Sequence, residues 1–387
     1  MRILLLAPQP FYQERGTPIA VRMLAKTLCE AGHHVDLLTF HLGEDVAIAG
    51  LRIFRIPRLW FIRRIPIGFS MAKLLCDLCL FFSLLRRLAR EQYDVVHAGE
   101  ESVFLALATR FLHRACVVYD MDSSMPDQLR EKWIGLRFLS YPLDALERLA
   151  LKRADVVVPV CQQLVDRACQ VKAPEQVVLL EDFALAVDDN SGQPVDRLRQ
   201  LLSVSGLLAL YVGNLEPYQG LDLLLAGFAR VDPQCDLSLV LIGGSPADLA
   251  DYQAKASSLG ISQRVYFLGP RPVSQLNDYL SQADILVSPR LKGVNTPMKI
   301  FSYLDSGRPI IATDISSHTQ VLDPGCALLV DPTPDALAQG FNQLAADQSL
   351  RQTLGQAGQS LARTRFSFSR FQATVNELYG ESGPLPG

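Results

Sequence analysis

The chain has 387 residues, of which 49% are hydrophobic and 20% are charged. An apolar share of this size supports large buried cores and excludes a disordered or fibrous chain. The formal net charge of −3 argues against a general nucleic-acid-binding protein. At about 150 residues per domain, the length corresponds to two or three domains.

The chain begins with an apolar run that ends before Pro8, which is shorter than the core of a signal peptide. Eight cysteines are scattered through apolar stretches, and only Cys76 and Cys79 form a C-x-x-C pair. That pair lies inside an apolar helical pattern, which favours free buried thiols over a metal or redox centre. We therefore expect a cytoplasmic protein without a bound metal.

Strand and helix patterns alternate through the first half of the chain. The apolar run 2–7 is typical of a buried parallel strand, and a glycine-containing loop at 13–18 and a helix at 19–31 follow it. Further strands are predicted at 35–40, 94–98, 115–119, 155–160 and 176–181. Such alternation predicts a parallel sheet with helices on both faces.

A polar, turn-rich segment at 184–205 interrupts the alternation and is interpreted as a linker. The pattern then resumes, with strands predicted at 207–212, 237–242, 264–268, 284–287, 309–312 and 327–330, and helices at 220–230, 246–258, 273–282, 297–306, 334–363 and 369–379. The predicted fold class is α/β, with two doubly wound Rossmann-like domains, 1–183 and 206–365, that face a cleft. The segment 366–387 is expected to pack back on the N-terminal domain.

The segment 52–90 carries nine basic residues and one acid, Asp77. Its second part, 69–90, has a helical pattern that is apolar around most of its circumference, but its longest apolar run is too short to span a bilayer. One interpretation is a buried helix beside a basic loop. The other is a surface that docks on an anionic membrane. In that second case the contact residues are Arg58, Trp60, Phe61, Arg63 and Arg64.

Several motifs follow one another in a familiar order: a glycine loop and helix at 16–28, GHHVDLLT at 32–39, DVVHAG at 94–99, a strand and loop at 209–224, LVLIGG at 239–244, RVYFLG at 264–269 and ADILVSP at 283–289. Together they resemble the retaining glycosyltransferases of family four, which have the two-domain GT-B fold. The resemblance covers nearly the whole chain. It implies transfer of a sugar from a nucleotide-diphosphate-sugar donor to an acceptor hydroxyl, with retention and without a metal or other cofactor.

The chain departs from this family at the donor site. Members usually carry two glutamates eight residues apart, and the Gly-x-Pro at 307–309 assigns those two positions to Val294 and Ser302. The arginine and lysine usual in the loop 213–220 are replaced by Asn214 and Gln219. Either other residues rebuild the site, or this copy is catalytically weak.

Arg290, Lys292 and Lys299 cluster around the motif NTPMK at 295–299 and are the candidate replacements. Thr296 is expected to cap a helix that begins near Pro297, and the N-terminus of such a helix would bind a phosphate. The alternative is a solvated basic loop. The predicted donor-binding residues are Gly16, Gly213, Asn214, Arg290, Asn295, Thr296, Lys299, Ser302 and, nearer the base, Arg271.

Asp120 and Asp122 end a predicted strand, where side chains of a doubly wound domain reach the ligand. We expect one of them to face the acceptor hydroxyl. Alternatives are a metal-bound nucleotide sugar, as in the GT-A class, and a cap on a helix near Pro126. His97 ends the preceding strand and is a third candidate catalytic residue, with a structural histidine as its alternative.

The expected partners are a nucleotide-sugar donor, a lipid-linked or saccharide acceptor and an anionic membrane surface, without nucleic acid. This combination predicts an enzyme of glycolipid or cell-envelope polysaccharide synthesis, peripheral on the inner face of the cell membrane. Two other functions stay open: a GT-B-fold sugar-nucleotide epimerase, and a non-catalytic protein that binds sugar nucleotides.

Overall fold

The computed structural model describes residues 1–66, 70–127, 140–185 and 196–380. It divides into two compact units: unit 1 contains 1–181 together with 371–387, and unit 2 contains 182–370. The second division falls inside helix α15 (Phe368–Leu378). The end of the chain therefore belongs to the N-terminal unit.

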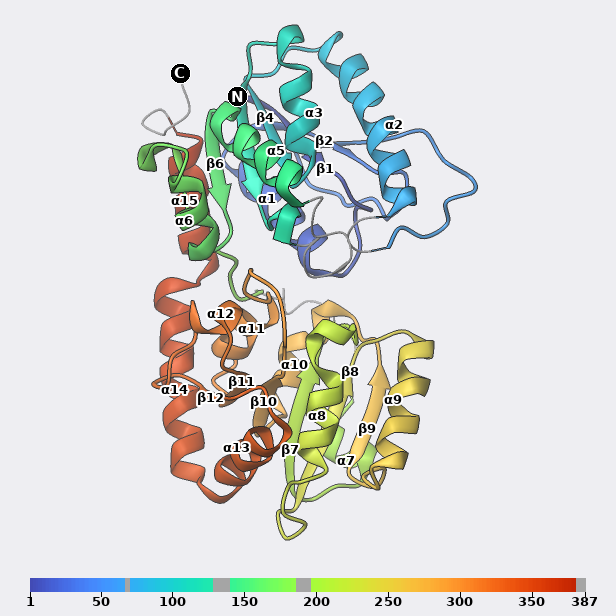
Figure 1. The fold of residues 1–387 in the computed structure, drawn as a ribbon, viewed down its shortest axis with the longest axis vertical. Helices are drawn as coiled ribbons and strands as arrows, with labels where there is room; N and C mark the ends of the chain where they lie inside the picture. Colours follow the sequence, from blue (N-terminus) through green and yellow to red (C-terminus); the bar gives the residue numbers. More distant parts are fainter. Residues whose placement is uncertain (67–69, 128–139, 186–195, 381–387) are drawn as a thin grey trace. The chain divides into compact units, whose positions relative to one another are not determined.

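Unit 1 is built on six parallel strands in the order β3-β2-β1-β4-β5-β6 (Figure 1). Ile3 of β1 is in register with Val35 of β2 on one side and with Val95 of β4 on the other. The strands are β1 (Arg2–Ala7), β2 (His34–Thr39), β3 (Leu51–Arg55), β4 (Val95–Gly99), β5 (Cys116–Met121) and β6 (Val156–Pro159). The helices are α1 (Gly16–Glu30), α2 (Met71–Leu88), α3 (Ser102–Ala108), α5 (Ser140–Arg153) and α6 (Gln162–Cys169).

Unit 2 repeats this arrangement with six parallel strands in the order β12-β11-β10-β7-β8-β9. The strands are β7 (Leu207–Val212), β8 (Leu237–Ile242), β9 (Val265–Gly269), β10 (Ile285–Ser288), β11 (Ile310–Thr313) and β12 (Leu328–Val330). The helices are α7 (Leu198–Leu202), α8 (Leu221–Phe228), α9 (Pro246–Ser258), α10 (Leu276–Ser281), α11 (Lys299–Asp305), α12 (Ser316–Thr319), α13 (Pro334–Ala346) and α14 (Gln348–Arg365).

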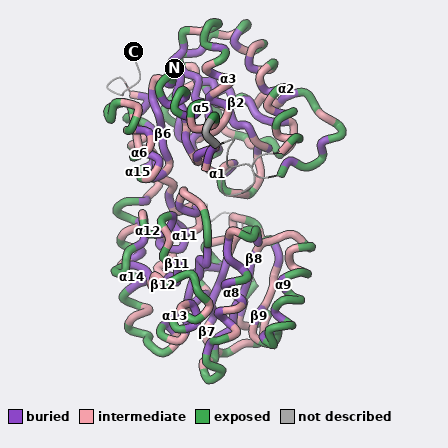
Figure 2. Tube along the Cα trace, in the orientation of Figure 1, coloured by how far each residue is buried: buried purple, intermediate pink, exposed green. Residues whose placement is uncertain are grey.

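Helices cover both faces of the unit 2 sheet, and alternate residues of β7 enter two separate cores. Ala209 and Tyr211 pack with α8, α9 and α13 on one face. Leu208 and Leu210 pack with α7, α10, α11 and α14 on the other. Figure 2 shows the strands of both units as buried, with the exposed surface on the helices and loops. The predicted α/β fold with two doubly wound domains is confirmed.

Two predicted elements differ from the structure, and one strand was not predicted. The strand expected at 176–181 is only an isolated bridge between Val177 and Val157 of β6. The unpredicted strand is β3, at the opposite edge of the sheet, which the sequence did not reveal because Arg52 and Arg55 interrupt its apolar pattern. The helix expected at 334–363 is two helices, since Asp347 accepts the N–H of Leu350 at 2.8 Å and caps α14.

The predicted linker 184–205 is not wholly separate from the domains. Its described part includes α7, whose Leu198 is completely buried in a core of unit 2. The N–H of Ala184 also donates to the carbonyl of Phe366 at 3.2 Å in the same unit. All eight cysteines are free thiols.

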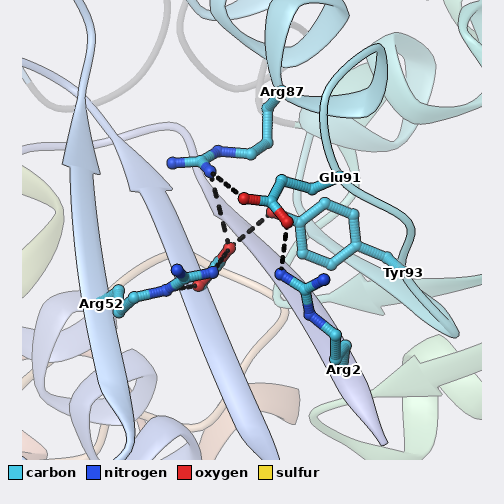
Figure 3. Close-up of polar contacts among 6 residues, drawn as sticks. Arg2, Arg52, Arg87, Glu91 and Tyr93 are labelled. Carbon is cyan, nitrogen blue, oxygen red and sulfur yellow. Dashed lines mark hydrogen bonds and ion pairs between the residues drawn. The ribbon is translucent and has the colours of Figure 1, made fainter.

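A charged network joins the second and third strands of unit 1 around Asp36, whose side chain is almost fully buried (Figure 3). Arg52 donates to both carboxylate oxygens, with Nε 2.7 Å from Oδ1 and Nη2 2.8 Å from Oδ2. The hydroxyl of Tyr93 donates to Oδ2 at 2.5 Å. Burial, and then this bond to Asp36, raise the pKa of Tyr93.

The same network holds the C-terminal end of α2. The Arg87 guanidinium lies 3.9 Å from Asp36 and 3.6 Å from Glu91, and it stacks on the ring of Phe54 at 3.4 Å from the centroid. Glu91 also pairs with Arg2 of β1 at 2.7 Å (Figure 3). The network therefore links α2 to three strands.

We expect Asp36→Ala to lower the free energy of unfolding of unit 1 by about 2 kcal/mol, because Arg87 and Tyr93 lose a buried acceptor. Asp335→Ala is the matched control, since Asp335 pairs with Arg230 at side-chain exposures of 76% and 49%. An exposed pair of this kind contributes less than about 1 kcal/mol. Urea unfolding, followed by far-UV circular dichroism, measures both, and equal midpoints for the two variants would contradict the assignment.

Candidate functional site

In open parallel sheets, ligands bind outside the carboxyl ends of the strands at the point where the strand order reverses. In unit 1 this point lies between β1 and β4, and in unit 2 it lies between β7 and β10. The loops that follow these four strands therefore define two candidate half-sites. Most of the residues predicted from sequence fall in or beside them.

The two loops of the unit 2 half-site are joined to each other. The N–H of Leu291, after β10, donates to the carbonyl of Tyr218, after β7, at 2.9 Å. Gly220 has a φ of +77°, and a Cβ there would lie 1.9 Å from the carbonyl oxygen of Pro289. Only glycine permits this backbone conformation at so close an approach.

Lys299, the first residue of α11, lies beside these loops. Its Nζ is 3.1 Å from Oε1 of Gln219 and 3.9 Å from the centroid of the Tyr211 ring. It also lies 3.4 Å from the position of a Cβ built on Gly213. The cation is therefore held by one amide oxygen and an aromatic face.

Burial, and then the charge of Arg290, lower the pKa of Lys299 well below its ordinary value. Within the described part of the chain, Lys299 forms no ion pair with a carboxylate. Such an ammonium gains favourable energy from any anion that reaches it. Gln219, at the position where the family usually has a lysine, is the residue that the Lys299 amine contacts.

Arg290 is turned toward its own loop. Its Nε donates to the carbonyl of Lys292 at 2.6 Å, and its two Nη atoms donate to the carbonyl and Oδ1 of Asn295 at 2.9 and 3.2 Å. Gly293 leaves room for it, because a Cβ there would lie 1.9 Å from Nη2 of Arg290. Arg290 and Asn295 thus shape the loop, and the structure does not aim them at a ligand.

The prediction that Thr296 caps a helix is wrong. Helix α11 begins at Lys299, two residues later than predicted, and Met298 is its N-cap residue without a side-chain hydrogen bond. The hydroxyl of Thr296 is buried and has no partner within the described residues. Ser302 is buried too, and its Oγ accepts the N–H of Leu185 at 3.3 Å.

The other predicted donor residues are dispersed. Asn214 is exposed, and its Oδ1 accepts the N–H of Glu216 at 3.4 Å. Arg271 follows β9, two strands away from the reversal point, and donates to the carbonyl of Leu268 at 2.6 Å. Gly16 begins α1 in unit 1, so the structure places it in a different unit from Lys299.

On the unit 1 side, His97 is completely buried and Nδ1 lies 2.5 Å from the hydroxyl of Tyr379. Nε2 is 3.1 Å from Oδ2 of Asp120, but its alignment does not make a hydrogen bond. The complete burial of His97 fits the alternative of a structural histidine rather than contact with a substrate. Tyr379 was missed because 282 residues separate it from His97 in the sequence.

Asp122 lies just beyond β5 and is half-buried. The hydroxyl of the neighbouring Ser124, at 3.5 Å, accepts the N–H of Asp127. Ser124 thus makes a contact of the kind that a helix cap would make. Asp120 and Asp122 both stay candidates for contact with an acceptor.

A buried acidic cluster follows β4 at the unit 1 half-site. Lys73 of α2 lies 2.6 Å from Oε1 of Glu101 and 3.6 Å from Oε2 of Glu100. Burial would lower the pKa of Lys73, but the charges of Glu100 and Glu101 outweigh it and the pKa is raised. Burial and then the charge of Glu101 raise the pKa of Asp77. Within the described residues, no group of three or more His, Cys, Asp or Glu side chains has the geometry of a metal site.

Two family descriptions match the chain: "Glycosyl transferase 4-like domain" over residues 15–181 and "Glycosyl transferases group 1" over residues 206–347. The D-inositol 3-phosphate glycosyltransferase of Corynebacterium glutamicum is 30% identical over 180 residues, which cover 44% of this chain and 43% of that protein. The chain spans about half the length of the curated relatives that it matches.

Solved structures of similar fold cover almost the whole chain. Sucrose-phosphate synthase from Thermosynechococcus elongatus has a TM-score of 0.80 at 21% identity and covers 98% of both chains. HepE from Anabaena, solved in complex with UDP, has a TM-score of 0.75 at 18% identity, with 97% and 99% covered. The fold is that of the two-domain GT-B glycosyltransferases. With both family descriptions matched in order, the chain belongs to the group 1 glycosyltransferases.

We expect the affinity for a nucleoside diphosphate to fall as pH rises through the lowered pKa of Lys299, because a bound anion favours the charged amine and takes up a proton. Lys299→Met should weaken binding of the nucleoside diphosphate about 30-fold, because it removes a charge-assisted hydrogen bond of about 2 kcal/mol. The same substitution should remove that part of the pH dependence. Calorimetric titration at several pH values over which the protein stays folded measures both effects.

Lys292→Ala is the control, since Lys292 is an exposed cation in the same stretch of chain. It should bind with nearly normal affinity and the same pH dependence. Arg271→Ala should likewise have little effect on the phosphates. If Lys299→Met binds normally while Arg271→Ala does not, the phosphate site lies elsewhere.

Proposed function

We propose that this protein transfers a sugar from a nucleoside-diphosphate sugar to an acceptor hydroxyl. The observation that carries the proposal is Lys299, an amine without a carboxylate partner in the described residues, at the reversal point of the unit 2 sheet. A diphosphate supplies the anion that this amine lacks. Charge also develops on the leaving diphosphate during transfer, where a preorganised cation lowers the barrier.

The buried hydroxyl of Thr296 supports the same assignment. It lies three residues before Lys299 and has no hydrogen-bond partner within the described residues. A buried hydroxyl of this kind gains about 1 kcal/mol when a ligand oxygen completes its bonding. Thr296 and Lys299 together offer a hydroxyl and an ammonium to the donor. Neither residue reproduces the missing glutamates, so contacts to the sugar come from other groups.

We further propose a hexosyl transfer with retention that needs no divalent metal, as the family resemblance implies. In this proposal Lys299 supplies the positive charge on the diphosphate. Chelation by EDTA should therefore leave the rate unchanged. A fall in rate that Mg²⁺ restores would contradict it.

The acceptor is proposed to be lipid-linked or saccharide, in glycolipid or envelope polysaccharide synthesis at the inner face of the membrane. The five predicted contact residues support this placement, because Arg58, Trp60, Phe61, Arg63 and Arg64 are all exposed. No helix in the described part of the chain is both long and apolar enough to cross a bilayer. Peripheral attachment is the form of membrane contact that these residues support.

A panel of UDP-, GDP- and ADP-sugars tests the function directly. A matching donor at 100 times its dissociation constant should stabilise the fold by about 2.7 kcal/mol, which raises the melting temperature. Turnover of that donor should then require an acceptor. Turnover of the donor without an acceptor would indicate the epimerase. Binding of the donor without turnover would indicate the non-catalytic protein. The matched relatives are named as glycosyltransferases and favour neither of these two alternatives.

We expect Asp122→Asn to slow transfer at least about 100-fold while donor binding persists, because a positioned acid–base group contributes 10²–10⁴-fold. Asp166→Asn is the control, since Asp166 is an exposed carboxylate on α6 of the same unit. Initial rates at saturating donor separate the two variants. A normal rate for Asp122→Asn would assign Asp122 a structural role instead.

A further inference from the structure

Helix α2 is apolar on two sides: Cys76, Leu80, Leu84 and Leu88 are buried in unit 1, and a second stripe of apolar side chains faces solvent. Lys73, Asp77 and Arg87 are turned inward, whereas five apolar residues on one stripe of the helix are 41–67% exposed. These five are Met71, Leu74, Leu75, Leu78 and Phe82. Their spacing of three and four residues keeps them on one side of the helix. We call them the α2 apolar face.

The orientation of α2 is held at both ends. Near its N-terminus Lys73 pairs with Glu101 at 2.6 Å. Near its C-terminus Arg87 stacks on Phe54 and lies within ion-pair distance of Asp36 and Glu91 (Figure 3). Rotating the helix to bury the α2 apolar face would expose Leu80 and Leu84, which are now buried, and would leave these charges unpaired. The α2 apolar face is therefore a fixed feature of unit 1.

The loop that leads to α2 carries the other half of the surface. Trp60 is 80% exposed and Phe61 57% exposed, and their rings meet edge to face at 5.7 Å. Arg58, Arg63 and Arg64 flank them and are exposed, as are Arg86 and Arg90 at the end of α2. Figure 1 shows this blue loop projecting from the side of unit 1 on which α2 lies. From residue 46 to residue 90 the one acid is Asp77, which is turned inward.

We propose that α2 lies in the headgroup region of an anionic lipid bilayer, with its apolar face toward the acyl chains and Trp60 and Phe61 inserted beside it. Apolar side chains rimmed by arginines are complementary to such an interface, where each basic residue contributes about 1 kcal/mol and tryptophan is enriched. A second copy of the chain fits less well, because a symmetric contact would bring the same arginines together.

This surface does not depend on the proposed sugar transfer, because vesicle binding requires neither donor nor acceptor. The test is co-sedimentation of the full chain with vesicles of phosphatidylcholine containing phosphatidylglycerol, and with phosphatidylcholine alone. We expect binding to the anionic vesicles, weakened by salt but not abolished. Absence of binding to them overturns the proposal.

Two variants separate the apolar and electrostatic parts. Leu74→Gln with Leu78→Gln should reduce partitioning at least tenfold at any salt concentration, because apolar insertion is not screened. Arg58→Glu, Arg63→Glu and Arg64→Glu together should release the protein at low salt. The matched control is Leu201→Gln with Leu259→Gln, two exposed leucines of unit 2, and it should bind normally. Normal binding by the Leu74/Leu78 variant overturns the proposal.

A second readout reports insertion itself. In a Trp133→Phe variant, Trp60 is the remaining tryptophan of the two in the chain. Its emission should shift to shorter wavelength on anionic vesicles and be quenched by brominated acyl chains. Emission that is not quenched assigns the α2 apolar face to another partner. A protein that binds no vesicles but forms a dimer, which the Leu74/Leu78 variant dissociates, also assigns the face to another partner. Because the substituted leucines and arginines are exposed, circular dichroism should show an unchanged fold for those variants.

Discussion

Parallel strand pairing is the constraint on which the chemistry of this protein depends. Both sheets are parallel throughout, so each strand is followed by a crossover and every loop after a strand lies at the same edge of its sheet. At the two reversal points, β1/β4 and β7/β10, neighbouring crossovers leave toward opposite faces. Lys299 and Gln219 lie at one of these points, and Glu100 and Glu101 lie at the other.

The two half-sites differ in electrostatics in a way that suits two different substrates. In unit 2 the cation Lys299 is held by an amide oxygen and a ring, so it lacks an anion. In unit 1 three carboxyl groups share one lysine, and burial raises the pKa of Asp77 and of Glu101. Carboxylate oxygens accept hydrogen bonds, which a sugar hydroxyl can donate, whereas an amine without a carboxylate partner suits an anion.

The orientation of α2 shows how buried charge can determine an exposed surface. Leucines usually decide which side of a helix faces the core, but α2 carries leucines on two sides. Leu80, Leu84 and Leu88 are the buried ones, and ion pairs made by Lys73 and Arg87 at the two ends of the helix, the second with Asp36, hold that choice. The acidic cluster after β4 thus both contributes to the unit 1 half-site and holds the helix that carries the α2 apolar face.

Local sequence pattern was sufficient for the doubly wound architecture. The apolar runs at 2–7, 207–212 and 237–242 became strands with the predicted bounds, because strands buried on both faces need unbroken apolar sequence. Pattern also identified Lys299 and the basic loop 58–64. It failed at β3, an edge strand whose arginines break the apolar run and pair with neighbours distant in sequence.

Only the tertiary structure decided which of the candidate polar residues are available to a ligand. Arg290 and Ser302 stood in the right stretch of sequence, yet folding commits the first to loop carbonyls and the second to Leu185. His97 is paired with Tyr379 from the far end of the chain. The sequence determined which residue types follow each strand, because that depends on neighbours along the chain. Whether a side chain keeps a free donor depends on partners far away in the sequence, such as Tyr379, 282 residues from His97, and packing alone sets those partners.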